Sequence, residues 1–117
     1  MQRLDQVAGL MLDARLSELQ KAARAREETL SHLADLSALV EPRGDLPQIA
    51  AALAALQYQR WADARRADLN LVLARQTAHW LDARDAARLA FGKAQALAGV
   101  AAKLAAAAPK PRQPPES

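Results

Sequence analysis

Apolar residues recur along the first part of the chain in alternating steps of four and three, the spacing typical of helices that pack in a coiled coil. The pattern covers about residues 3–40, where the apolar positions are Leu12, Leu16, Leu19, Ala23, Leu30, Leu33 and Val40. Arg26 and Ser37 occupy the remaining steps. We therefore expect one long helix with a narrow apolar seam along one side.

A second pattern covers about residues 47–107 and predicts a longer helix. From Leu69 onward the steps hold through Leu73, Gln76, Trp80, Ala83, Ala87, Ala90, Ala94, Leu97, Ala101 and Leu104. Upstream, Ile49, Leu53 and Leu56 keep the spacing in a shifted register. This shift predicts a phase slip between residues 57 and 68, as in a coiled-coil stutter, and leaves open whether the helix is kinked there.

Proline and glycine interrupt the two patterns only at residues 41–47 and 109–117. The first interruption predicts a turn over 41–46, with Asp45 capping the second helix and Gln48 as its capping-box partner. The second predicts a disordered, proline-rich tail over 109–117. The expected fold is therefore all-α: a two-helix antiparallel coiled-coil hairpin over 1–108, with the second helix longer than the first.

Folding the chain at Gly44 predicts which residues face each other. The N-terminal end of the first helix then lies opposite about position 85, and the second helix continues past it for about 20 residues, or about 30 Å. This predicted overhang, Ala86–Ala107, contains Phe91, Leu97 and Leu104 without an intramolecular partner. We expect another chain to cover it, either a second copy or a dedicated partner.

Composition makes the expected core thin. Hydrophobic residues form 51% of the chain and aromatic residues only 3%, because 30 residues are alanine and 19 are leucine. Alanine buries little surface, so apolar content does not translate into a thick core. The four aromatic residues, Tyr58, Trp61, Trp80 and Phe91, all lie on the second helix. They are either the bulkiest parts of the core or exposed anchors for a partner.

Residue chemistry gives no support for catalysis or a cofactor. The chain has no cysteine, which excludes disulfides and thiolate metal sites. Its two histidines, His32 and His79, lie too far apart in the expected hairpin to share a metal. Acidic residues have basic neighbours at helical spacing, which favours surface ion pairs over catalytic carboxylate pairs. We expect no enzymatic activity, no cofactor and no metal.

Charge and hydropathy restrict the partners further. Sixteen basic and 13 acidic residues are interleaved and sum to +3, which is too mixed for a nucleic-acid-binding stripe. No apolar stretch has the roughly 18 residues of a membrane span, and the first residues lack the apolar core of a signal peptide. We expect a cytoplasmic protein with at most peripheral membrane contact.

Two stretches of the second helix resemble a known family. Gln59–Asn70, which contains Trp61, and Ala90–Leu97, which contains Phe91, are similar to members of the FliJ family of flagellar type III export proteins. The layout also agrees: two long helices, a turn with glycine, a longer second helix and a short basic tail with prolines. The resemblance implies a non-enzymatic stalk that enters the export ATPase ring, links it to the export gate and associates with chaperones of export substrates.

The sequence thus predicts a coiled-coil interaction rod. The residues expected to contribute most to packing or partner contact are Trp61, Trp80, Phe91, Leu97 and Leu104, with Arg84 and Arg88 lining the end of the rod. Two alternatives stay open. One is a structural bundle formed by self-association, and the other is an amphipathic helix that coats a membrane or a hydrophobic granule.

Overall fold

The computed structural model describes residues 2–39 and 47–107. Helix α1 spans Gln2–Ala38 (37 residues), and helix α2 spans Gln48–Ala107 (60 residues). At 1.5 Å per residue, α2 is about 90 Å long. The turn expected at 41–46, the Asp45 cap and the tail expected at 109–117 lie outside the described residues.

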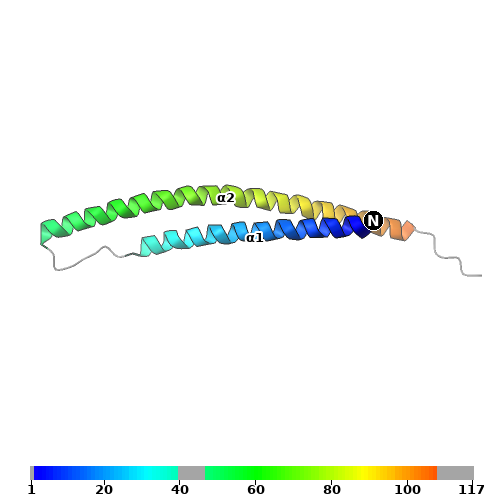
Figure 1. The fold of residues 1–117 in the computed structure, drawn as a ribbon, viewed down its shortest axis with the longest axis horizontal. Helices are drawn as coiled ribbons and strands as arrows, with labels where there is room; N and C mark the ends of the chain where they lie inside the picture. Colours follow the sequence, from blue (N-terminus) through cyan, green and yellow to red (C-terminus); the bar gives the residue numbers. More distant parts are fainter. Residues whose placement is uncertain (1, 40–46, 108–117) are drawn as a thin grey trace, which may run out of the picture.

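The two helices run antiparallel and side by side along the whole of α1 (Figure 1). This arrangement confirms the all-α, two-helix hairpin with a longer second helix. Figure 1 also shows that α2 extends past α1 at both ends, because its first turns lie beyond the last turn of α1 and its last turns lie beyond the N-terminus. Each helix therefore has only one neighbour to pack against.

The helix ends are closed by local hydrogen bonds. At the start of α2, the carbonyl of Pro47 accepts a hydrogen bond from the Ala51 N–H at 2.8 Å. Proline suits this position because its fixed φ is compatible with the first turn of a helix. At the end of α1, the Leu39 N–H donates to the Leu36 carbonyl at 3.4 Å, and the Ser37 hydroxyl donates to the Leu33 carbonyl at 3.1 Å.

The core is as thin as the composition predicts. Its buried apolar residues are five alanines and two leucines: Ala22, Leu36, Ala62, Leu69, Ala83, Ala87 and Ala90. No side chain in the described chain is less than 2% exposed. Leu36, Ala62 and Leu69 form the main cluster, and Leu33 and Tyr58 pack against it. The main cluster of buried residues therefore lies near the end of α1.

The seam predicted for α2 from Leu69 onward is confirmed for most of its length. Leu69, Ala83, Ala87 and Ala90 are buried, and Leu73, Gln76, Trp80, Ala94, Leu97 and Ala101 are half-buried. Only Leu104 departs from it, with 55% exposure. Leu104 is exposed because it lies in the last turns of α2, past the end of α1.

The seam predicted for α1 is largely confirmed, since six of its eight described positions are half-buried: Leu12, Leu19, Ala23, Arg26, Leu30 and Leu33. The fully buried residues Ala22, Thr29 and Leu36 each lie one position before an expected one, and Ser37 is exposed. Val40 lies outside the described residues. Leu16, also predicted on the seam, is 43% exposed. Adjacent apolar residues occur at several of these steps, so spacing alone does not decide between them.

The upstream seam predicted for α2 is wrong. Ile49, Leu53 and Leu56 are 78%, 56% and 48% exposed. The half-buried residues in this part are instead alanines and Tyr58, at positions 50, 51, 54, 55 and 58. The helix continues without a break through residues 57–68, where the phase slip was expected. The larger side chains were therefore a misleading guide to the inward face.

The overhang of α2 is much shorter than the predicted Ala86–Ala107, because only the last turns of α2 lie past α1 (Figure 1). Ala86, Ala90 and Leu97 lie across from α1, around a hollow that Arg15, Met11 and Leu4 line from the other side. The prediction assumed a tight turn at Gly44, whereas the observed pairing places the start of α2 well past the end of α1 (Figure 1). A connection of about nine residues can reach about 30 Å, so chain length permits this register.

Candidate partner-binding surfaces

Both histidines are exposed, His32 on α1 and His79 on α2. Across residues 2–39 and 47–107, no group of three or more His, Cys, Asp or Glu side chains could hold a metal ion. Within the same residues, neither helix contains a segment apolar enough to cross a bilayer. The features that distinguish this surface are therefore its exposed apolar residues.

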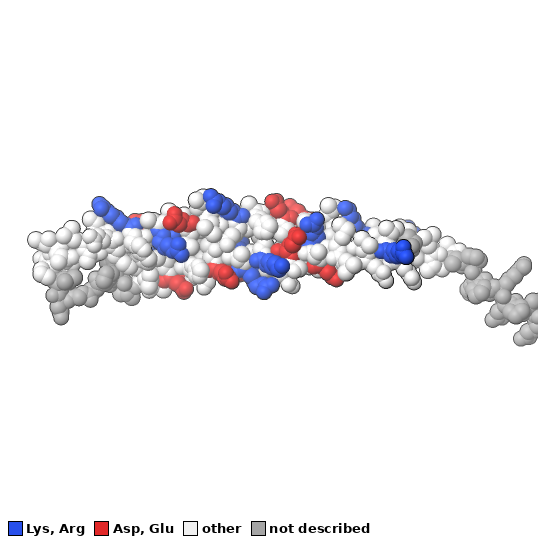
Figure 2. Space-filling view, viewed as in Figure 1, with Lys and Arg blue, Asp and Glu red and all other residues white. Residues whose placement is uncertain are grey.

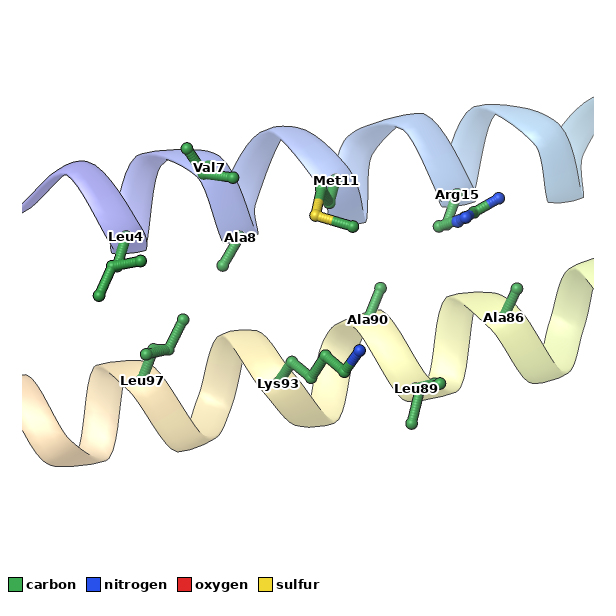
Figure 3. A pocket seen from close by; sticks show the side chains of 10 residues that line it. All are labelled: Leu4, Val7, Ala8, Met11, Arg15, Ala86, Leu89, Ala90, Lys93 and Leu97. Carbon is green, nitrogen blue, oxygen red and sulfur yellow. The ribbon is translucent and has the colours of Figure 1, made fainter.

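One hollow lies between the start of α1 and the C-terminal half of α2 (Figure 3). We call it the terminal groove, and its cavity volume is about 290 Å³. Five residues from each helix line it: Leu4, Val7, Ala8, Met11, Arg15, Ala86, Leu89, Ala90, Lys93 and Leu97. Eight of these ten residues are apolar, and the remaining two, Arg15 and Lys93, are basic.

The walls of the terminal groove are large side chains that the hairpin itself does not cover. Leu4 is 55% exposed, Val7 52%, Met11 50% and Leu89 63%. The centre of the groove is hollow because Ala8 on α1 and Ala90 on α2 have side chains too small to fill it (Figure 3). Small seam residues between large flanking residues thus produce a hollow with apolar walls.

A second hollow lies near the end of α1, and we call it the tryptophan patch. Its cavity volume is about 230 Å³, and its lining residues are His32, Asp35, Leu36, Leu39, Trp61, Arg65 and Leu69. Trp61 is 52% exposed and its ring lies 6.0 Å from that of Tyr58, with the planes tilted by 41°. An exposed tryptophan beside an arginine has the composition of an interface hot spot.

Trp80 occupies a different environment, within the paired length of the rod. The guanidinium of Arg26, from α1, lies 5.4 Å from the indole centroid, and that of Arg84 lies 5.6 Å from it. Arg26 Nε also donates a hydrogen bond to Thr77 Oγ1 at 3.0 Å. These contacts join the two helices, so Trp80 stabilises the hairpin and is not an open anchor.

The remaining predicted contact residues do not form one site. Phe91 is 52% exposed but does not line either hollow, whereas Leu97 is half-buried in the terminal groove. Arg84 lies beside Trp80 and approaches Asp85 at 3.7 Å, and Arg88 is exposed. Arg84 lies between Trp80 and the terminal groove, and Arg88 lies in the α2 stretch of the groove without lining it, so neither is at the end of the rod where they were expected.

Sequence reasoning missed most of the terminal groove. Leu4, Val7, Met11 and Leu89 were not among the predicted contact residues, because the expected register paired α1 with a different part of α2. A signal was nevertheless present in the sequence. Leu4 and Met11 are seven residues apart with Val7 and Ala8 between them, so the start of α1 has an apolar stripe beside its seam.

Charged residues of both signs are interspersed over the face of the rod in Figure 2. Two of the described ion pairs join residues three apart on one helix, Arg15 with Glu18 at 3.2 Å and Arg66 with Asp63 at 3.4 Å. Exposed pairs of this kind contribute little to stability.

Comparison of the chain with family models, curated proteins and solved structures found no match.

Proposed function

We propose that this protein is a non-enzymatic coiled-coil rod that binds another protein through apolar surface on its sides. One observation carries the proposal: the large apolar side chains are mostly exposed while the core is mostly alanine. Among residues 2–39 and 47–107, only Leu36 and Leu69 are large buried apolar residues, whereas Leu10 and Leu89 are 68% and 63% exposed. Exposed apolar surface on this scale marks interaction sites in soluble proteins.

The specific form that we propose is a FliJ-like stalk of the flagellar type III export apparatus. In this role the rod binds the export ATPase ring in the cytoplasm and connects it to the export gate or to substrate chaperones. The support is the similarity of Gln59–Asn70 and Ala90–Leu97 to that family, together with a two-helix layout that is compatible with a stalk. Trp61 lies in the first of these stretches and is half exposed.

A pull-down and an ATPase assay with the export ATPase from the same genome test the specific form. We expect the rod to bind the ATPase and to raise its turnover. We also expect Trp61→Ala to weaken binding, while Leu71→Ala, at a similarly exposed site away from both hollows, leaves it unchanged. Absence of both binding and stimulation at micromolar concentration would contradict the export role.

A structural role through self-association is the second candidate, and the distribution of exposed apolar residues along α2 supports it. Large apolar side chains are exposed along most of α2, from Ile49 at 78% to Leu104 at 55%, beyond the extent of either hollow. Several helices packed around one another would cover them. Sedimentation over a range of concentrations distinguishes the candidates, since a stable tetramer supports the bundle and a monomer supports the rod.

A further inference from the structure

The terminal groove has the length of a short helix. Its α1 wall extends from Leu4 to Arg15 and its α2 wall from Ala86 to Leu97. Each wall is therefore about 16 Å long, which corresponds to about three helical turns. A third helix laid along two packed helices places residues at steps of three, four and seven in such a groove.

The walls present apolar contacts at matching intervals. Leu4 and Met11 lie two turns apart on α1, and Leu89 lies on the outer edge of α2 (Figure 3). All three side chains are at least half exposed. Leucine, isoleucine or phenylalanine side chains at every second turn of an incoming helix could contact both walls and fill the hollow centre above Ala8 and Ala90.

The charged residues that line the groove have one sign. Arg15 lies at one end, the Lys93 side chain extends along α2 toward Ala90, and none of the ten lining residues is acidic (Figure 3). Glu18 partly neutralises Arg15 through their 3.2 Å ion pair. Lys93 has no ion pair within residues 2–39 and 47–107. Acidic residues beside the apolar stripe of an incoming helix would complement this charge.

The same charges disfavour a second copy of the chain as the occupant. Two rods facing each other through this groove would place four basic side chains, two Arg15 and two Lys93, in one interface. Like charges placed across an interface lower its affinity.

We propose that the terminal groove binds an amphipathic helix of another protein, about three turns long, with large apolar residues on one face and acidic residues beside them. This inference rests on the proposed role as an interaction rod and specifies the partner.

Binding of labelled helical peptides, followed by fluorescence anisotropy, tests this proposal. The probe is an 18-residue peptide with leucines on one face and glutamates beside them, and the comparison peptide has lysines in place of the glutamates. We expect the glutamate peptide to bind the full chain at least about fivefold more tightly at low salt. The preference should shrink at high salt, because screening weakens exposed charge pairs.

Two matched leucine variants locate the binding. Leu89→Ser removes an exposed side chain from the groove wall, whereas Leu53→Ser removes a similarly exposed side chain at the other end of α2. We expect Leu89→Ser to weaken the glutamate peptide about tenfold and Leu53→Ser to have no effect, with circular dichroism showing both variants folded. Lys93→Glu should reverse the charge preference so that the lysine peptide binds more tightly.

Several results would overturn the proposal. Neither peptide binding, both binding equally, or Leu53→Ser weakening binding as much as Leu89→Ser would each do so. A dimer of the wild-type chain that Leu89→Ser dissociates would assign the groove to a second copy. Flotation with phosphatidylglycerol vesicles that Leu89→Ser abolishes would assign it to a lipid surface. If the peptides do not bind but the export ATPase is still stimulated, the groove inference fails and the proposed function stands.

Discussion

At the scale of the residue, alanine determines how this hairpin holds together. Ala22, Ala83 and Ala87 are almost fully buried but contribute little surface each, so the few buried leucines contribute disproportionately. Leu36 is 6% exposed and belongs to the main cluster, whereas Leu39, three positions later, is 51% exposed. Two leucines within one turn of sequence therefore have very different environments.

We expect Leu36→Ala to lower the free energy of unfolding by about 2–3 kcal/mol, because it removes a buried side chain and leaves a cavity. Leu39→Ala should lower it by less than about 1 kcal/mol, since that side chain is half in solvent already. Urea denaturation followed by circular dichroism measures both. Equal effects of the two substitutions would show that the main cluster does not stabilise the rod as described.

Glycine inside a helix offers a second test at this scale. A Cβ placed on Gly92 or Gly99 meets no atom within 4 Å, and neither residue has a positive φ. Gly99→Ala should therefore raise the free energy of unfolding by about 0.5–1 kcal/mol, because alanine restricts the unfolded chain more. Ala98→Gly is the matched control and should lower it by a similar amount. Destabilisation by Gly99→Ala would contradict the open space around this glycine.

At the scale of the element, the helices could be predicted from the sequence but their alignment could not. The step pattern and the prolines locate two long helices, and the α2 seam downstream of Leu69 is largely correct. Register depends instead on which heptad of α1 meets which heptad of α2. Alanines recur every seven residues along α2, so several shifts bury similar surface, and the contacts of Arg26 with Thr77 and Trp80 do not show in the spacing.

Cross-linking checks the register, and the absence of native cysteine makes the experiment simple. Leu4→Cys with Leu97→Cys places two thiols on opposite walls of the terminal groove. A short bismaleimide should cross-link this pair efficiently. Leu4→Cys with Leu81→Cys is the control, since Leu81 lies about 24 Å further along α2. Preferential cross-linking of the control pair would support the tight-turn register instead.

At the scale of the whole molecule, the terminal groove depends on how α1 is aligned with α2 more than on any one sequence motif. Trp61 was recognisable in the sequence as a bulky residue among alanines, and the structure places it in the tryptophan patch. The terminal groove could not be recognised in this way, because its two walls are far apart in sequence and face each other only in the observed register. Predicting Leu97 without Leu4 or Met11 identified one wall and missed the other.

The observed alignment also predicts which end of α2 is dispensable for folding. Ending the chain after Val100 removes the turns that lie past α1, including Leu104, which is 55% exposed. We expect the free energy of unfolding to change by less than about 1 kcal/mol, because such end turns fray at little cost. Deleting residues 2–8, which uncovers Leu97, should destabilise the rod more in the same urea titration. Equal losses would contradict the alignment of α1 with the C-terminal half of α2.

The pairing of Leu4 with the region of Leu97 also affects when the terminal groove forms during synthesis. A ribosome that adds about 5–20 residues per second makes the α1 wall roughly 4–16 s before the α2 wall. During that interval Leu4, Val7 and Met11 have nothing to pack against, and an isolated helix is only marginally stable. A partner helix that requires both walls therefore does not bind a chain whose α2 is still incomplete. It binds only after α2 has been synthesised and has packed against α1.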